Sequence, residues 1–286
     1  MSWENILWSA CAAIAALVLL SAAVSDVRTR EVGDMHWKVL CAAGMPCSAA
    51  ALACSLPLLP VAVSFLSSVL MAAYVLSDRL GGHWALAASL VFSAVSYLMC
   101  PPCAGRAFLL SPAAFSVLFL VMYYSGMLAG GADAKAMVSL SLAFPAYPDI
   151  PFLPLAWQPL YPASFVISLP VSALISAAFI SVVPMAFVGF RNASEGRLGL
   201  RMFSEYPMAL KEAESSYVWP AVDVENGELI RRRPSGDPGE AFARLKAAGI
   251  EEIPVTPMIP FVAPIAAGFI AVIIAGNPLF AFVREK

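Results

Sequence analysis

Eight long apolar stretches limit the possible folds of this chain more than any other feature of its sequence. A helix that crosses about 30 Å of hydrocarbon needs about 20 apolar residues, and most of the stretches have this length. Because 60% of the residues are hydrophobic and only 13% are charged, we predict an all-α polytopic membrane protein with about eight transmembrane helices. The stretches cover residues 5–25, 37–55, 57–77, 84–104, 107–129, 134–153, 163–188 and 258–283.

One polar block, residues 190–256, interrupts this pattern before the last apolar stretch. Inside it, two alternating runs flank Asn226 and Gly227, a pair typical of a two-residue hairpin turn. A helix is predicted to begin at Pro238, with Asp237 as its N-cap, and to stop at Gly249. The block is therefore expected to be a small α+β cytoplasmic insert. It divides the chain into residues 1–189 with seven transmembrane helices, the insert at 190–256, and the last helix at 257–286.

The basic residues predict the orientation of the chain, since cytoplasmic loops carry an excess of Lys and Arg. If the amino terminus lies outside, 14 of the 17 Lys and Arg residues are cytoplasmic, most of them in the insert. We therefore expect a multi-pass protein of the cell membrane. No Lys or Arg precedes the first stretch, which is expected to be a retained span rather than a secretory signal. The net charge of −2 gives no indication of a nucleic-acid partner.

All six cysteines lie within or at the ends of apolar stretches, where cysteine usually packs as a small hydrophobic side chain. The spacing of Cys100 and Cys103 is also typical of a redox pair or of half a zinc site. A zinc site would need two further ligands, and the chain has only two histidines, His36 and His83. A structural role is favoured, and neither a metal nor a cofactor is expected.

Two aspartates directly abut apolar stretches: Asp26 follows the first, and Asp133 precedes the sixth. The predicted topology places both on the cytoplasmic side. Each has an ordinary explanation, because Asp133 suits a helix N-cap and Asp26 could pair with Arg28 or Arg30 at the interface. Ionisable groups within membranes are, however, usually functional. Together the two carboxyl groups match a pair that shares one proton and hydrolyses amides without a metal or a covalent intermediate.

Asp133 belongs to the stretch GGADAKAM, in which Gly130, Gly131 and Ala132 precede it and Lys135 follows it. Glycines let the backbone bend and lie close to a neighbouring helix or to an extended peptide, although an ordinary turn would also explain them. No Gly-x-Ser-x-Gly elbow offers an alternative nucleophile. The stretch is therefore expected to position Asp133.

These residues resemble the type IV prepilin peptidases, and among them the archaeal preflagellin and prepilin peptidases, which are membrane aspartyl proteases with a Gly-x-Gly-Asp motif. The stretch DVRTREVGD at 26–34 is similar to the family's first aspartate segment. GGADAKAM resembles the second, with Ala132 in place of the second glycine, and TPMIPFVAPIAAGF at 256–269 resembles the start of the last span. The resemblance implies that Asp26 and Asp133 are the catalytic pair of an aspartic endopeptidase.

The resemblance also implies the substrate, a pilin-like or archaellin precursor whose short leader is cut on the cytoplasmic side, just before its hydrophobic segment. Such a leader is basic before the cut. The acids Glu31, Asp34 and Asp78 line the expected entrance and could attract it, or they are ordinary solvated loop charges. Bacterial relatives often carry a four-cysteine zinc module and also N-methylate the product. The loop from Asp26 to His36 has no cysteine, so we expect no methyltransferase activity.

The ends of the helices suggest which aspartate holds the shared proton. The N-terminus of a helix favours the ionised form of a nearby carboxyl group and the C-terminus disfavours it, by about 0.3 to 1 kcal/mol. Asp133 is expected at an N-terminus and Asp26 at a C-terminus. On this hypothesis Asp133 is the base and Asp26 carries the proton.

A second class of protein stays open. Paired acids in membranes also serve secondary transporters or other ion-coupled proteins, in which Asp26 and Asp133 would form a proton or cation site. Such sites usually lie near the middle of the bilayer, whereas both aspartates are expected at its inner edge. That position favours the enzyme. The Tyr-Asp and Pro-Ala-Leu signatures of presenilin-like proteases are absent.

Overall fold

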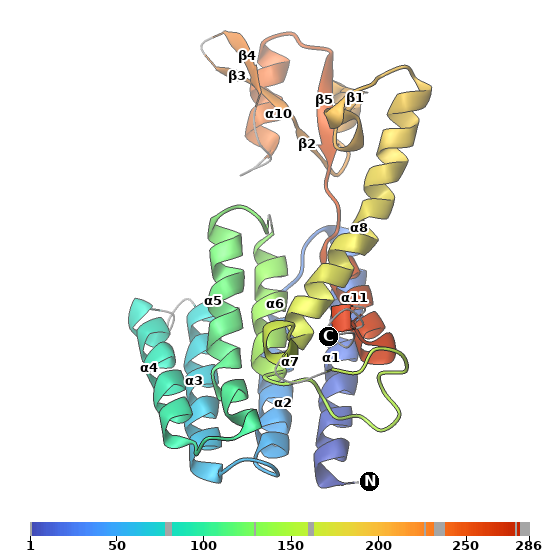
Figure 1. The fold of residues 1–286 in the computed structure, drawn as a ribbon. Coiled ribbons are helices and arrows are strands. Elements are labelled where there is room, and N and C mark those ends of the chain that lie inside the picture. Colours follow the sequence, from blue (N-terminus) through green and yellow to red (C-terminus); the bar gives the residue numbers. More distant parts are fainter. Residues whose placement is uncertain are drawn as a thin grey trace. The chain divides into compact units, whose positions relative to one another are not determined.

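The computed structural model describes residues 2–77, 82–128, 130–159, 163–225, 227–231, 238–277 and 279–280. The chain divides into two compact units. The first consists of Met1–Ile180 and Phe261–Lys286 and is helical, and the second, Ser181–Pro260, contains the strands (Figure 1).

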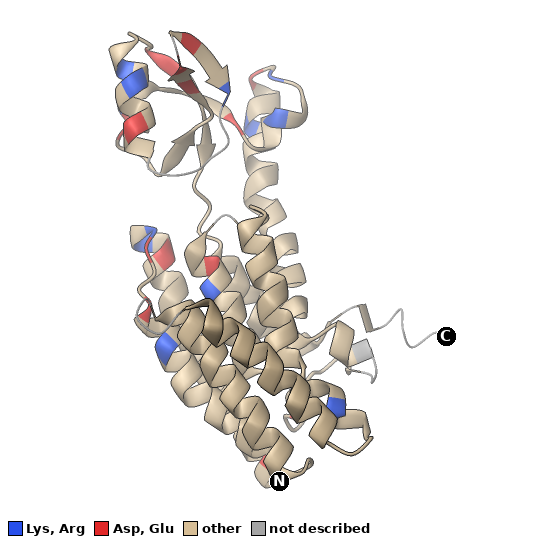
Figure 2. Ribbon diagram, turned by 90° about the vertical axis from the view of Figure 1, so that its left-hand side faces the viewer, with Lys and Arg blue, Asp and Glu red and all other residues tan. Residues whose placement is uncertain are grey.

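A helix occupies each of the eight apolar stretches. Three of these helices, α1, α3 and α8, are long and apolar enough to cross a membrane, which supports a membrane protein. Helices α4, α5 and α11 are apolar but shorter. Most charged residues lie in the second unit and at one end of the first unit. The long helices contain few of them (Figure 2). The helices are α1 (Trp3–Thr29), α2 (Met35–Leu52), α3 (Leu58–Leu76), α4 (His83–Met99), α5 (Ser111–Tyr124), α6 (Gly131–Ala143), the short α7 (Ala163–Val166), α8 (Leu169–Ser194) and α11 (Val262–Ala275), with a 3₁₀ turn η1 (Ala104–Leu109) before α5.

Two helix boundaries near the aspartates differ from the prediction. Helix α1 continues past the expected end and stops at Thr29, where Arg30 adopts a left-handed conformation (φ 58°) and its N–H donates to the carbonyl of Asp26. Asp26 therefore lies in the last turn of α1. Helix α6 begins at Gly131 and ends after 13 residues at Ala143. The next two residues are Phe144 and Pro145, and a residue before proline avoids the helical conformation. At about 1.5 Å per residue, α6 covers only about 20 Å.

Aromatic rings and small residues hold the helices of the first unit together. Trp8 of α1 stacks on Phe144, which also contacts Phe269 of α11, with ring centroids 6.4 and 5.4 Å apart. A Cβ on Gly268 of α11 would lie 2.5 Å from the carbonyl oxygen of Ala173 in α8. Small residues at such crossings let helix backbones approach closely, as is common in membrane bundles. Helices α1, α6, α8 and α11 are thus fixed against one another around the first unit's core.

The second unit has α+β structure. Strands β1 (Tyr206–Ala209), β5 (Glu252–Pro257) and β2 (Val218–Pro220) form an antiparallel sheet in the order β1-β5-β2. Strands β3 (Val222–Glu225) and β4 (Glu228–Arg231) form a hairpin, and α10 (Pro238–Ala247) packs against β2 and β3. The remaining elements are the 3₁₀ turn η2 (Leu200–Phe203) and the short helix α9 (Leu210–Ala213).

The local predictions for this unit are confirmed where the structure describes them. Glu225 pairs with Glu228 across the predicted two-residue turn, and Gly227 has the positive φ (83°) that such a turn requires. Gly249 ends α10 with a φ of 71°. Asn226 and Asp237 lie outside the described residues. A bidentate pair links α10 to β3, because Arg244 donates to both carboxylate oxygens of Asp223 at 2.9 and 2.7 Å. These hydrogen bonds raise the pKa of Arg244 above its ordinary value.

Candidate active site

Asp26 joins the end of the first helix to the start of the last. Its side chain is only 8% exposed, and its Oδ2 accepts a hydrogen bond of 3.0 Å from the backbone N–H of Val262. Val262 is the first residue of α11, so this N–H has no partner within its own helix. The carboxyl group of Asp26 therefore caps α11. The sequence analysis did not identify Val262, and its only signal is its place at the start of the last apolar stretch.

Asp133 lies in the first turn of α6, but it is not the N-cap. The N-cap is Gly130, and Asp133 is the third residue of the helix. The backbone of Gly130 hydrogen-bonds to the Asp133 carboxyl group, as in one half of a capping box. The side chain is half-buried. Asp133 is thus held in place by the residue that begins its own helix.

The structure brings the two aspartates close enough for their charges to interact, although they lie 107 residues apart in the sequence. Helix α11 packs against both α1 and α6, and α1 also contacts α6. The C-terminal end of α1 and the N-terminal ends of α6 and α11 lie toward the same end of the first unit (Figure 1). When the charges of two carboxyl groups interact, the ionisation of one affects that of the other.

The helix-end hypothesis places each aspartate at the correct end of its own helix. Asp26 does lie in the last turn of α1, but its carboxyl group also meets the N-terminus of α11. The nearby charge of Arg30 acts on Asp26 in the same direction. Both influences favour an ionised Asp26, whereas its burial, which is the largest influence, favours the neutral form. The third helix end, which the sequence could not place beside Asp26, removes the reason for assigning the proton to it.

Gly130 and Gly131 differ in how tightly they are enclosed. A Cβ on Gly130 would lie 2.5 Å from Oδ2 of Asp133, which is too close for any side chain. The nearest atom to a Cβ on Gly131 is the hydroxyl oxygen of Tyr123, at an ordinary 3.7 Å. Ala132 is half-buried and packs against the core of the first unit. Gly130 is therefore required by the position of the Asp133 carboxyl group itself.

Lys135 and Asp34 form an ion pair between α6 and the loop that follows α1. Lys135 Nζ lies 2.6 Å from Asp34 Oδ1, and both side chains are half-exposed. The pair ties the segment after Asp26 to the helix that carries Asp133. Of the other acids expected to attract a substrate, Glu31 is exposed and Asp78 lies outside the described residues.

Cys100 and Cys103 lie at the C-terminal end of α4, with their sulfur atoms 4.0 Å apart and both thiols free. Cys100 is buried and Cys103 is exposed. The six cysteines take no part in the contacts of the two aspartates described above.

Comparison with known proteins identifies a distant relative. The chain is 23% identical over 182 residues to the preflagellin peptidase of Methanococcus voltae, an alignment that covers 59% of this chain and 73% of that protein. No protein-family model matches the chain. The similarity agrees with the resemblance that the aspartate segments suggest.

Proposed function

We propose that this protein is a membrane aspartic endopeptidase that removes the short leader of archaellin or type IV pilin-like precursors. The proposal is supported by the placement of Asp26 and Asp133 within range of each other's charge, where three helices pack together. The similarity to a preflagellin peptidase supports it. The precursor is the partner, and the reaction needs neither a metal nor a methyl donor.

In the proposed mechanism, the pair begins with one proton, carried by Asp133. Ionised Asp26, held by the Val262 N–H, takes a proton from water, and the hydroxide oxygen forms a bond to the peptide carbonyl carbon. Asp133 donates its proton to the carbonyl oxygen. As the C–N bond of the tetrahedral intermediate breaks, the proton on Asp26 passes to the leaving nitrogen and one hydroxyl proton of the intermediate returns to Asp133, which restores the starting pair. A neutron map with the shared deuteron on Asp26 would contradict this assignment.

We further propose that eight helical segments lie in the membrane, with the amino terminus outside and the second unit in the cytoplasm. The distribution of Lys and Arg supports this orientation. Helix α6 is too short to span alone, so the irregular segment after it would complete the sixth crossing, buried among its neighbours. The site then faces the cytoplasm at the inner edge of the bilayer.

The test is cleavage by the purified full chain in lipid vesicles that also contain a full-length archaellin or pilin precursor. We expect one new amino terminus, just before the hydrophobic segment of the precursor, identified by mass spectrometry. A chelator should not change the rate. A folded chain that leaves all such precursors intact but conducts protons or cations across the vesicles would contradict the peptidase and support the transporter.

A further inference from the structure

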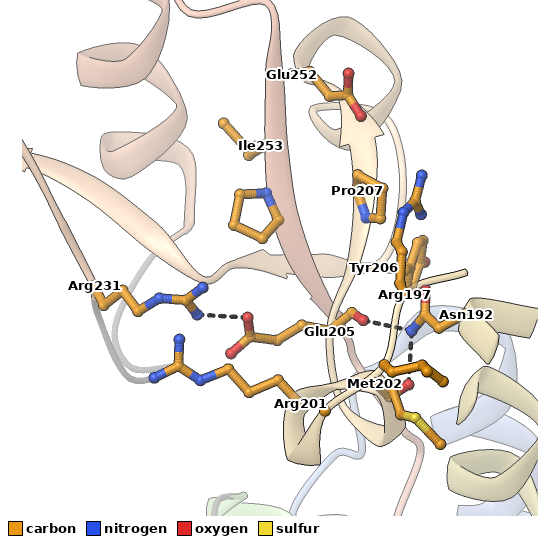
Figure 3. Close-up of a pocket in the computed structure, with 13 residues that line it drawn as sticks. Asn192, Arg197, Arg201, Met202, Glu205, Tyr206, Pro207, Arg231, Glu252 and Ile253 are labelled. Atoms are coloured by element: carbon orange, nitrogen blue, oxygen red, sulfur yellow. Dashed lines mark hydrogen bonds and ion pairs between the residues drawn. The ribbon is translucent and has the colours of Figure 1, made fainter. Parts of the chain in front are cut away.

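A pocket of about 460 Å³ lies in the second unit, next to the end of α8 (Figure 3). Its wall combines Asn192 of α8, the segment that follows this helix, and residues of β1, β4 and β5. Asn192 is 1% exposed, and its Nδ2 donates to the carbonyl oxygens of Met202 and Glu205 at 2.6 and 2.7 Å. This buried amide holds the segment against the helix end and gives the pocket a fixed wall.

Three arginines line the pocket: Arg197, Arg201 and Arg231. Arg197 pairs with Glu195 at 2.7 Å and Arg231 with Glu205 at 2.6 Å. Among the residues that the structure describes, no ion pair involves Arg201. The side chains of Arg201 and Arg231 extend toward each other from opposite sides, next to Glu205 (Figure 3). Surface ion pairs contribute little, so these arginines can exchange carboxylate partners for a phosphate, which guanidinium groups bind in a bidentate manner.

The length of α8 places this pocket at the level of lipid headgroups. The helix has 26 residues, whereas about 20 residues cross the hydrocarbon of a bilayer. Asn192, which is near the C-terminal end of α8, then lies just beyond the hydrocarbon. Helix α8 ends in a left-handed Gly196 (φ 75°), and the chain turns again at Gly199 (φ 143°). The pocket thus follows directly from a membrane-crossing helix.

Two leucines in this turn are among the most exposed apolar side chains of the protein. Leu198 is 81% exposed and lines the pocket, and Leu200 is 94% exposed. They lie between Arg197 and Arg201 in the stretch RLGLR. Apolar side chains beside basic ones are typical of segments that lie in the membrane interface, where the apolar groups enter the acyl region and the cations contact anionic headgroups.

We propose that the pocket binds the headgroup of an anionic phospholipid. Arg201 and Arg231 contact its phosphate, while Leu198 and Leu200 enter the acyl layer beside it. The proposal goes beyond the peptidase activity and depends only on α8 crossing the membrane.

The experiment is native mass spectrometry of the full chain, released from detergent micelles that contain equal amounts of phosphatidylglycerol and phosphatidylcholine with identical acyl chains. We expect the wild type to retain one phosphatidylglycerol in preference. Arg201→Gln should lower the retained fraction about fivefold, which corresponds to the about 1 kcal/mol expected for one basic residue at an anionic surface. Arg201→Lys should keep most of the preference, and Leu200→Ser should weaken retention of both lipids.

The matched control is Lys211→Gln, which removes an exposed cation of the same unit that does not line the pocket. This variant should retain phosphatidylglycerol as the wild type does. Equal retention of the two lipids by the wild type, or an unchanged preference in Arg201→Gln, would overturn the proposal. Displacement of the lipid by equimolar glycerol 3-phosphate would also overturn it, because it would show a site for a free phosphate ester.

Discussion

The backbone N–H of Val262 donates a hydrogen bond of 3.0 Å to Oδ2 of Asp26, across 236 positions of the sequence. This contact joins the end of α1 to the start of α11. It gives the Asp26 carboxyl group a structural role, as the cap of α11, in addition to its proposed chemical role. The two roles can be separated by substitution, because only one of them needs a negative charge.

Asp26→Asn should leave the fold intact and Asp26→Ala should weaken it. The amide oxygen of asparagine can still accept from the Val262 N–H, whereas alanine leaves this N–H without its partner at a cost of about 1 kcal/mol. Thermal unfolding of both variants in detergent micelles measures the difference, with Glu31→Ala, at an exposed site, as control. An Asp26→Ala variant as stable as the wild type would show that the cap contributes nothing.

Gly130→Ala should reduce leader removal by about 100-fold, the effect expected when a catalytic group is displaced by about 1 Å. Its new Cβ would meet Oδ2 of Asp133 at 2.5 Å and push the carboxyl group away. Gly131→Ala is the matched control, since its Cβ meets only Tyr123 at an ordinary 3.7 Å. The control should keep most of the activity in the vesicle assay. Equal losses in the two variants would contradict a specific role for Gly130.

The ion pair of Asp34 with Lys135 predicts rescue by a charge swap. Asp34→Lys alone places two cations together and should lower kcat about fivefold, in keeping with about 1 kcal/mol for a half-exposed pair. Adding Lys135→Asp should restore most of the rate. If Asp34 instead attracts the basic leader, the double variant will keep a KM above that of the wild type, because residue 34 is then a cation. Glu31→Lys serves for comparison. Glu31 is exposed, so this change should alter only the attraction of the leader, and therefore KM, while kcat stays the same.

Apolar length and turn chemistry predict much of this fold. The eight stretches each contain a helix, and the hairpin around Gly227 and the stop at Gly249 follow from local backbone preferences that neighbouring structure does not override. Boundaries were less predictable. Helix α1 includes Asp26 and stops where Arg30 adopts a left-handed conformation, and α6 ends at Ala143, two residues before Pro145. Hydropathy is averaged over about 20 residues, so it does not show the residue at which either helix ends.

The candidate site was predictable only in part. The two aspartates stand out in the sequence because they abut apolar stretches. The cap on Val262 and the pair of Lys135 with Asp34 join the aspartate segments to partners that only folding identifies, whereas Gly130 belongs to the same stretch as Asp133. The first of these also removes the helix-end argument for placing the shared proton on Asp26. A sequence shows which helix end is next to a carboxyl group along the chain. It does not show which ends of other helices pack beside that group.

The most direct test of the account is the rate of leader removal by Asp26→Asn and by Asp133→Asn in the reconstituted assay. Asp149→Asn, an aspartate beyond the end of α6, is the matched control. The account predicts that each of the first two variants folds and yet loses at least about 100-fold in rate, while the control cleaves as the wild type does. Wild-type cleavage by either Asp26→Asn or Asp133→Asn would contradict it.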